Sequence, residues 1–323
     1  MRAMVVPRFG GPEVFECHDV AVPEPGAGQV SIDVAHVSVN FTDVRNRRGD
    51  GLGTPPMIPG IEASGTVRAV GDGVSDLRPG MAVTSLTGGH AYAEVVVADA
   101  SRVLPIPASL VGDPVAACLM GVLPSVLNLL RLAGKVFPGE SMLIHGASGG
   151  GGTTLVQAAH LMDLGPVFGT VSTQWKADYA RNYAFSRVFL RDEFDTALME
   201  ATSGRGVDVV FDPVGGEVRA RSFEVLAPFG RLVHFGNASL DPEVVPGAAW
   251  LRAKCVGYVG YSGGQHVALD FETVSRSWRQ AVDLVASGAV RIDVTRVFPL
   301  EEAAKAHRAI EAGEVVGKVV LEV

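Results

Sequence analysis

A glycine-rich turn between an apolar strand and a helix-forming run is the part of this chain best suited to ligand chemistry. The run Gly146-Ala147-Ser148-Gly149-Gly150-Gly151-Gly152 separates an apolar segment from helix-favouring residues. Three glycines spaced three residues apart suit the turn on which a dinucleotide pyrophosphate rests, because they allow a tight turn, a close backbone approach and close helix–strand packing. The free N–H groups and the dipole of the helix start attract the anion. We therefore predict a dinucleotide site here rather than a merely flexible loop.

The end of the second strand of this unit predicts which dinucleotide binds. A site for NAD normally carries a carboxylate there, which accepts hydrogen bonds from the ribose 2′-hydroxyl. Here Ser172, Thr173 and Lys176 follow the strand without a carboxylate, and Arg191 comes just after the third strand. The two hydroxyls could donate to a 2′-phosphate and the two cations could neutralise it. The pattern favours NADP(H) over NAD(H), the alternative being that Lys176 is simply solvated at a helix start.

Residues 1 to about 112 have an all-β pattern that indicates a partly open barrel. Short strand candidates rich in Val are separated by turn signals such as Pro25-Gly26 and Pro79-Gly80. The expected strands are Gln29–Val37, Ala63–Val70, Met81–Ser85 and Tyr92–Val97.

From Pro114 to about Gly264 strands and helices alternate, which predicts a parallel sheet with helices on both faces. The expected strands are Ser141–His145, Pro166–Val171, Arg187–Leu190, Val207–Asp212, Gly230–Gly236 and Lys254–Val259, with helices such as Thr153–Leu164 and Lys176–Ala184 between them.

The remaining residues hold two amphipathic helices, around Ser275–Ser287 and Leu300–Ala312, and two strand-like runs, Val294–Phe298 and Lys318–Val323. This part has no core of its own, so we expect it to return to the first domain. The expected domains are residues 1–113, 114–264 and 265–323.

The length and composition of the chain exclude several classes of protein. At 323 residues the chain is long for one core, and 47% hydrophobic against 19% charged residues argues against disorder. A net charge of −8 argues against a nucleic-acid partner. No apolar run approaches the roughly 20 residues that span a bilayer, and the N-terminus has the pattern of a strand rather than of a cleaved signal. We expect a cytoplasmic protein with a small-molecule substrate.

The three cysteines, Cys17, Cys118 and Cys255, lie far apart, without the paired spacing of a zinc site or a disulfide framework. This fits a reducing compartment, and we interpret all three thiols as small buried apolar groups.

Several motifs resemble the medium-chain dehydrogenases/reductases. In the first part these are residues 39–43 (VNFTD), 59–65 (PGIEASG), 70–71 (VG) and 79–83 (PGMAV). Residues 145–150, 204–216 and 230–237, with the ending 298–307 and 317–321, are similar to the quinone oxidoreductase and enoyl reductase branch. The resemblance covers essentially the whole chain. It implies an α/β fold, with a GroES-like β-barrel catalytic domain and a Rossmann domain whose doubly wound parallel sheet binds the cofactor.

The resemblance also implies an activity, the transfer of hydride from NADPH to the β-carbon of an activated alkene or to a quinone. It adds Phe235, Gly236 and Asn237 to the cofactor site. Zinc-dependent relatives hold a metal through Cys and His, but here the matching segment is Gly60-Ile61-Glu62 and no Cys lies near Asp43. Zinc therefore lacks its preferred ligands, and we predict no metal.

Without a metal, the chemistry depends on positioning. Asn40 matches the family position that faces the nicotinamide, and its amide can donate to a carbonyl oxygen as charge develops there; the alternative is a turn residue that satisfies its own backbone. We expect Asp43 to order that loop. We place four residues in the substrate pocket: Phe41, Asp43, Arg45 and Ser125.

A Tyr and a Thr that many relatives place near the nicotinamide are absent from the expected positions. Tyr258 and Tyr261 are candidates to supply cleft hydroxyls instead, and we expect one of them to converge with Asn40; the alternative is that they are packed aromatics. In many relatives the segment at the entry to the cofactor domain reads Leu-Thr-Ala-Tyr. Here residues 123–126 read Leu-Pro-Ser-Val, and Ser125 could supply the missing hydroxyl with a shift of one residue.

Three functions stay open: an NADPH-dependent reductase of an enone or enoyl thioester, a quinone reductase, and a nucleotide-binding protein with lost or altered catalysis, as in the lens crystallins that resemble this family. The resemblance further implies a homodimer that pairs the edge strands around Lys254–Val259.

Overall fold

The chain folds into two compact units. The computed structural model describes residues 1–51 and 53–323, and its contacts divide them into unit 1, Met1–Val122 with Trp278–Val323, and unit 2, Leu123–Ser277. The sequence had placed the two boundaries at 113/114 and 264/265. Unit 2 is one continuous stretch, whereas unit 1 is built from two separated pieces.

Specific contacts explain why both boundaries lie later than expected. Residues 114–118 form a 3₁₀ helix that stays with unit 1, where the hydroxyl of Thr84 donates to the carbonyl of Ala116 at 2.8 Å. At the second boundary, Ser277 in α9 (Phe271–Ala286) donates to the side chain of Asn128, which ends α2 (Val122–Asn128), at 2.9 Å. The start of α9 therefore belongs with unit 2.

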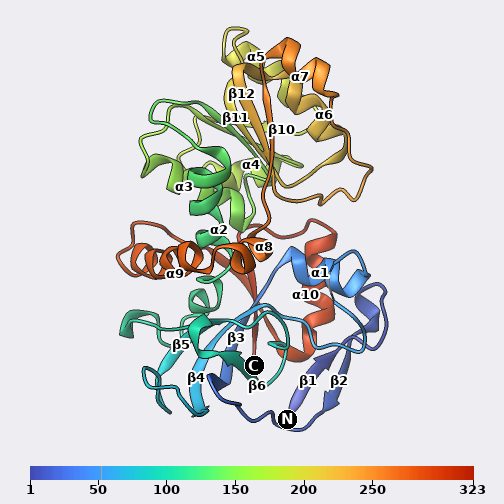
Figure 1. The fold of residues 1–323 in the computed structure, drawn as a ribbon. Coiled ribbons are helices and arrows are strands. Elements are labelled where there is room, and N and C mark those ends of the chain that lie inside the picture. The colour runs from blue at the N-terminus through green and yellow to red at the C-terminus, as the bar shows by residue number, and fades with distance from the viewer. Residues whose placement is uncertain (52) are drawn as a thin grey trace. The chain divides into compact units, whose positions relative to one another are not determined.

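Unit 1 is built around a sheet with the strand order β14-β15-β3-β4-β5-β7, in which β6 also pairs with β3 (Figure 1). The strands are β3 (Gln29–Val39), β4 (Glu62–Val70), β5 (Ala82–Leu86), β6 (Val95–Asp99), β7 (Val103–Pro105), β14 (Val294–Pro299) and β15 (Lys318–Glu322). A separate two-stranded sheet pairs β1 (Arg2–Val5) with β2 (Glu16–Asp19), and the helices include α1 (Phe41–Arg48), α10 (Ala303–Glu311) and residues 278–286 of α9. Apolar side chains such as Val30, Ile32, Val67, Val83 and Leu321 fill the core.

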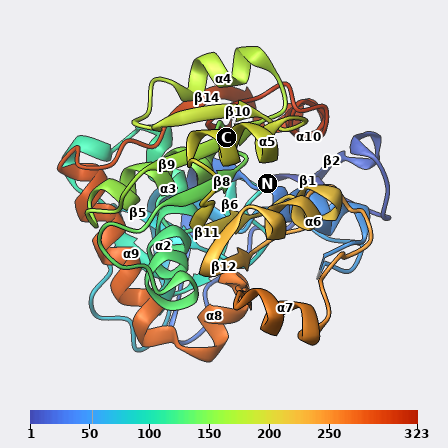
Figure 2. The ribbon, with the colours of Figure 1, turned by 90° about the horizontal axis from the view of Figure 1, so that it is seen from above.

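Unit 2 is a six-stranded parallel sheet with the order β10-β9-β8-β11-β12-β13. Its strands are β8 (Met142–His145), β9 (Val167–Val171), β10 (Arg187–Leu190), β11 (Val207–Asp212), β12 (Leu226–His234) and β13 (Gly257–Gly260). Its helices include α3 (Gly150–His160), α4 (Gln174–Ala180), α5 (Phe194–Ala201), α6 (Gly216–Glu224), α7 (Ala248–Lys254) and α8 (Gly263–Leu269). Figure 2 shows α3 and α6 on opposite faces of this sheet. The prediction of a doubly wound parallel sheet is confirmed.

Three details of the sequence interpretation were wrong: the start of β13, the burial of two cysteines and the start of β6. Lys254 ends α7, and Cys255 adopts a left-handed conformation (φ 52°) that terminates the helix, so β13 starts only at Gly257. Only Cys118 is buried: Cys17 is exposed on β2, whose side chains are all exposed, and Cys255 is exposed at the helix end. The strand expected at Tyr92–Val97 likewise begins later, at Val95.

Candidate cofactor and active site

The glycine turn of unit 2 has the geometry of a phosphate cradle. Gly146 directly follows β8 with φ +71°, a conformation that side chains rarely adopt. A Cβ on Gly152 would lie 2.4 Å from the Gly146 carbonyl oxygen, so only glycine lets α3 pack this closely on the turn. By contrast, a Cβ on Gly151 would meet open space. The side chains of Ala147 and Ser148 are buried beneath the turn. The N-terminus of α3 is therefore open to an anion, as dinucleotide binding requires.

The residues expected to select the 2′-phosphate come together at the ends of β9 and β10. The ammonium of Lys176 donates to the hydroxyl of Ser172 at 3.2 Å, and Thr173 is the N-cap of α4. Partial burial and, secondarily, the positive charge of Arg191 lower the pKa of Lys176. The Nε atom of Arg191 is buried without a hydrogen-bond partner. A bound phosphate would neutralise the two close cations and accept a hydrogen bond from the unsatisfied Nε of Arg191. These residues therefore fit the 2′-phosphate of NADP(H).

Two residues that the sequence analysis missed organise the end of β12. Arg219 and Asp212 are fully buried and form an ion pair of 2.6 Å, and Arg219 also donates to the carbonyl of Gly236 at 2.7 Å. Phe235 donates its N–H to the Asp212 carbonyl, and the Asn237 side chain bonds the carbonyl of Asp241. The predicted segment 235–237 is thus fixed at a strand end. The available signal was a carboxylate as the last residue of an apolar strand, with an Arg seven residues later.

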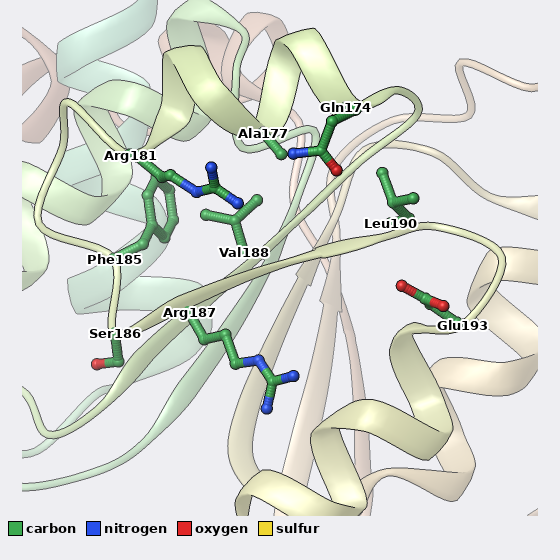
Figure 3. Close-up of a pocket in the computed structure, with 9 residues that line it drawn as sticks. All are labelled: Gln174, Ala177, Arg181, Phe185, Ser186, Arg187, Val188, Leu190 and Glu193. Atoms are coloured by element: carbon green, nitrogen blue, oxygen red, sulfur yellow. The ribbon is translucent and has the colours of Figure 1, made fainter.

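A pocket of about 380 Å³ lies beside this region, between α4 and β10. Figure 3 shows Gln174 and Ala177 of α4 facing Val188 and Leu190 of β10. Its residues flank Lys176 and Arg191 in sequence, but none of the predicted cofactor residues lines it.

In unit 1, Asn40 belongs to a buried polar cluster. Its amide nitrogen donates to Glu62 at 3.0 Å, and its amide oxygen accepts from Lys318 at 2.7 Å. The ammonium of Lys318 lies 3.7 Å from the Glu62 carboxylate, and both side chains are nearly inaccessible. The second Glu62 oxygen accepts from the N–H of Gly121, where a Cβ would lie 2.9 Å from the carboxylate. The sequence analysis did not identify Glu62 or Lys318 as members of a site.

Asp43 organises the backbone next to Asn40. Its carboxylate accepts from the N–H of Asn40 at 2.8 Å, at the start of α1, and from the N–H of Gly60 at 3.2 Å. Burial raises the pKa of Asp43 to about 7, although these hydrogen bonds and the charge of Lys318 act in the opposite direction. Asp43 therefore joins the turn before α1 to the segment that leads into β4.

The remaining pocket candidates of unit 1 lie on α1. Phe41 is half-buried, and Arg45 donates to the carbonyl of Asp50 at 2.7 Å. Arg47 is fully buried and pairs with Glu311 at 2.6 Å. Arg45 and Arg47 therefore make contacts within unit 1, which their spacing in the sequence did not predict.

The two candidate tyrosines have different surroundings. The ring of Tyr258, on β13, stacks on His234 with centroids 4.8 Å apart and contacts Phe223 in the core against α6. Tyr261 lies just beyond the strand. Its hydroxyl lies 3.1 Å from Nδ1 of His266, and hydrogen bonding with the side chains of Asn128 and Ser125 acts to lower the pKa of the phenol, against the larger effect of burial. The structure therefore brings Tyr261 together with the predicted Ser125 and leaves Tyr258 in an aromatic cluster.

The described residues, 1–51 and 53–323, contain neither a cluster of metal ligands nor a membrane-spanning helix. No group of three or more His, Cys, Asp or Glu there is arranged to hold a metal ion. None of their helices is long and apolar enough to cross a membrane.

Comparisons with known proteins add a whole-length likeness. A family model described as "Alcohol dehydrogenase GroES-like domain" matches residues 26–108, and one described as "Zinc-binding dehydrogenase" matches residues 175–321. A 2-haloacrylate reductase from Burkholderia sp is 33% identical over 99% of this chain and 98% of its own length. Among solved structures, a mycobacterial protein complexed with NADPH is 32% identical with a TM-score of 0.92, covering all of both chains. The quinone oxidoreductase of Escherichia coli complexed with NADPH, 27% identical, has a TM-score of 0.91 and the same coverage.

Proposed function

The chain belongs to the quinone oxidoreductase-like medium-chain dehydrogenase/reductase family, and on that premise we propose that it is an NADPH-dependent reductase of activated C=C bonds. The acceptor would be an alkene conjugated with a carbonyl group, as in an enone or enoyl thioester. The observation that carries the proposal is the cofactor half of unit 2, where an open glycine turn follows β8 and Ser172 with Lys176, rather than a carboxylate, follows the neighbouring strand β9. The whole-length likeness to a 2-haloacrylate reductase supports the choice of a C=C acceptor.

Each group of residues has a defined task in this proposal. NADPH, when bound, supplies the hydride. The turn 146–152 holds the pyrophosphate through backbone N–H groups, while Ser172, Thr173, Lys176 and Arg191 hold the 2′-phosphate. Asn40, fixed by Glu62 and Lys318, presents its amide to the acceptor. The free thiols suit the reducing cytoplasm, where we propose the protein works.

The direct test is NADPH consumption against a panel of enones, enoyl thioesters, quinones and aldehydes, with product analysis. Saturation of the C=C bond with the carbonyl retained supports the proposal. Faster turnover of quinones than of any alkene would assign the quinone oxidoreductase activity that a solved relative carries in its name. NADPH binding without turnover of any acceptor would favour a nucleotide-binding role.

NADPH is expected to bind about ten- to hundredfold more tightly than NADH, because Lys176 and Arg191 meet the 2′-phosphate with charge-assisted hydrogen bonds of roughly 1.5–3 kcal/mol. Lys176→Ala should remove most of this preference and leave the affinity for NADH unchanged. Fluorescence titration with both reduced cofactors measures the effect, and Lys254→Ala, on the exposed surface of α7, is the matched control. Equal affinities in the wild-type protein would refute the assignment.

We further propose a homodimer formed through β13. This strand pairs with β12 on one side and is the last of its sheet, and such edges are commonly paired or covered. The N–H of Tyr261 donates to the carbonyl of His234 at the end of β12. Successive backbone N–H groups of a strand point to opposite sides, so those of Tyr258 and Gly260 point away from β12, toward the free edge of the sheet. Light scattering should give twice the chain mass at micromolar concentration, and hydrogen exchange should show these two amides protected. A monomer mass with rapid exchange at both amides would contradict the dimer.

A further inference from the structure

The phenol of Tyr261 is held by side chains that come from elsewhere in unit 2. The backbone N–H of Tyr261 donates to the carbonyl of His234 at 2.9 Å, which fixes the residue at the carboxyl end of β13. Asn128 is almost fully buried, and its amide oxygen accepts from Ser277 at 2.9 Å. The amide nitrogen is therefore left to donate to the phenol oxygen, which Ser125 also contacts by a hydrogen bond.

His266 supplies a third polar atom at the phenol. Its Nδ1 atom, on α8, lies 3.1 Å from the Tyr261 hydroxyl, and the tautomer of the ring decides which of the two groups donates. Gly263 lies between Tyr261 and His266 in the sequence and begins α8. A Cβ on Gly263 would lie 2.8 Å from the Ser125 hydroxyl, so glycine allows the start of α8 to approach α2. The phenol oxygen thus has three polar partners, Ser125, Asn128 and His266, arranged around it.

The protonation state of this phenol suits an acid. Burial raises the pKa of Tyr261 to about 12, while the hydrogen bonds from Asn128 and Ser125 act in the opposite direction. The phenol therefore carries its proton at neutral pH, and the two hydrogen bonds are the contacts that would stabilise the phenolate after its loss.

The position of Tyr261 in the strand order indicates which half of the cofactor it would face. Ligands of such sheets lie across the carboxyl ends of the strands. The 2′-phosphate residues stand at β9 and β10, and the glycine turn follows β8. The order β10-β9-β8-β11-β12-β13 then leaves β11 to β13 for the nicotinamide half, where the acceptor is reduced.

We propose that Tyr261 is the proton donor of the reduction, and that Ser125, Asn128 and His266 are its positioning residues. The inference rests on the proposed function. Hydride addition at the β-carbon moves the electron pair of the C=C bond onto the acceptor as an enolate. The O–H bond of Tyr261 then breaks, and its proton forms the new C–H bond at the α-carbon. Ser125 and Asn128 donate to the resulting phenolate, which regains its proton from water by way of His266: Nδ1 passes a proton to the phenolate oxygen while the ring takes one up from water.

The central experiment compares wild type with Tyr261→Phe during reduction of an α-substituted enone by NADPH in D₂O. General acids contribute about 10²–10⁴-fold, so the turnover of Tyr261→Phe should fall within that range while its affinity for NADPH is unchanged. The wild-type product should carry deuterium at the α-carbon in one configuration, and the variant product in both, because water then protonates either face. Tyr183→Phe, which removes a phenol hydroxyl near α4, is the matched control and should match wild type.

A second measurement tests the positioning residues. In Ser125→Ala, loss of one hydrogen bond to the phenolate should slow proton transfer relative to hydride transfer. The solvent isotope effect on kcat should therefore rise, and the isotope effect of 4-deuterated NADPH should fall. A merely structural role would not move the two effects in opposite directions. Asn128→Ala should change the two isotope effects in the same way. Asn128 is buried, so if that variant fails to fold, Ser125→Ala still tests the positioning role.

The outcomes separate this inference from the function on which it rests. An active wild type whose Tyr261→Phe variant keeps its rate and a single product configuration would overturn the inference alone. Loss of stereocontrol in Tyr258→Phe instead of Tyr261→Phe would overturn it as well. A wild-type protein that reduces no acceptor of the panel would overturn the proposed function together with the inference.

Discussion

Replacing Lys318 with methionine is expected to lower the free energy of unfolding by about 3–5 kcal/mol, the cost of leaving one member of a buried ion pair without its partner. Glu62 is fully buried and Lys318 is 5% exposed, so water cannot replace the lost charge. Chemical denaturation followed by circular dichroism measures the change. Because the chain has two units, a separate transition of unit 1 should shift most.

Two further variants show whether the effect comes from the buried charge. Lys305→Met removes an exposed lysine of α10 that pairs with Glu302, and such surface pairs contribute about 0–1 kcal/mol. The double variant Glu62→Gln with Lys318→Met removes both charges and should regain much of the stability. Equal losses in the single and double variants would show that packing, rather than an uncompensated charge, sets the effect.

Asn40→Ala is expected to lower turnover by about 10²–10³-fold, the range for removing one donor to a developing oxyanion. One amide N–H of Asn40 is directed at Glu62, but its contacts with Ser38, at 3.4 and 3.5 Å, are long. The second N–H is thus the one available to a carbonyl oxygen, because hydrogen bonds of that length are weak. Steady-state kinetics with the best acceptor measures the loss.

The affinity for NADPH distinguishes a catalytic from a structural role of Asn40. Its contacts are confined to unit 1, whereas the predicted phosphate-binding residues lie in unit 2, so fluorescence titration should give an unchanged dissociation constant. Asn182→Ala, an exposed asparagine just after α4, serves as the control. An unaltered rate for Asn40→Ala would remove the residue from the mechanism, and a parallel loss of cofactor binding would point to misfolding.

The fold could be predicted because its signals are local and repeated. Alternating strands and helices identified the parallel sheet, and the spacing of Gly146, Gly149 and Gly152 located its first turn. Errors arose where local patterns compete. Residues 254–256 continue an apolar run into β13, but the helix ending at Lys254 and the left-handed Cys255 delay the strand. Cys17 lies on a strand whose side chains are all exposed, a tertiary fact that no local pattern carries.

The candidate cofactor residues could be predicted because they follow neighbouring strands of one sheet. Ser172, Lys176 and Arg191 follow adjacent strands, so parallel topology brings them together. The pair Glu62–Lys318 was missed because its members lie more than 250 positions apart in the printed sequence. A signal existed nonetheless: Lys318 begins an apolar strand, and a buried lysine needs a partner. Nothing in the run of arginines 45–48 indicated that Arg47 alone would be enclosed.

The order in which the strands of unit 1 pair has a consequence for how the protein is made. β15 lies inside the sheet, parallel to β14 and antiparallel to β3, with Leu321 opposite Val37. Its partner β3 is translated almost a whole chain length earlier, whereas all of unit 2 is one uninterrupted stretch. Long-range pairings of this kind close late and fold slowly, while contiguous domains fold as units during synthesis. On the ribosome, unit 2 can therefore be complete while β3 still exposes an unpaired edge, and β15, which is translated after unit 2, both closes that edge and delivers Lys318 to Glu62.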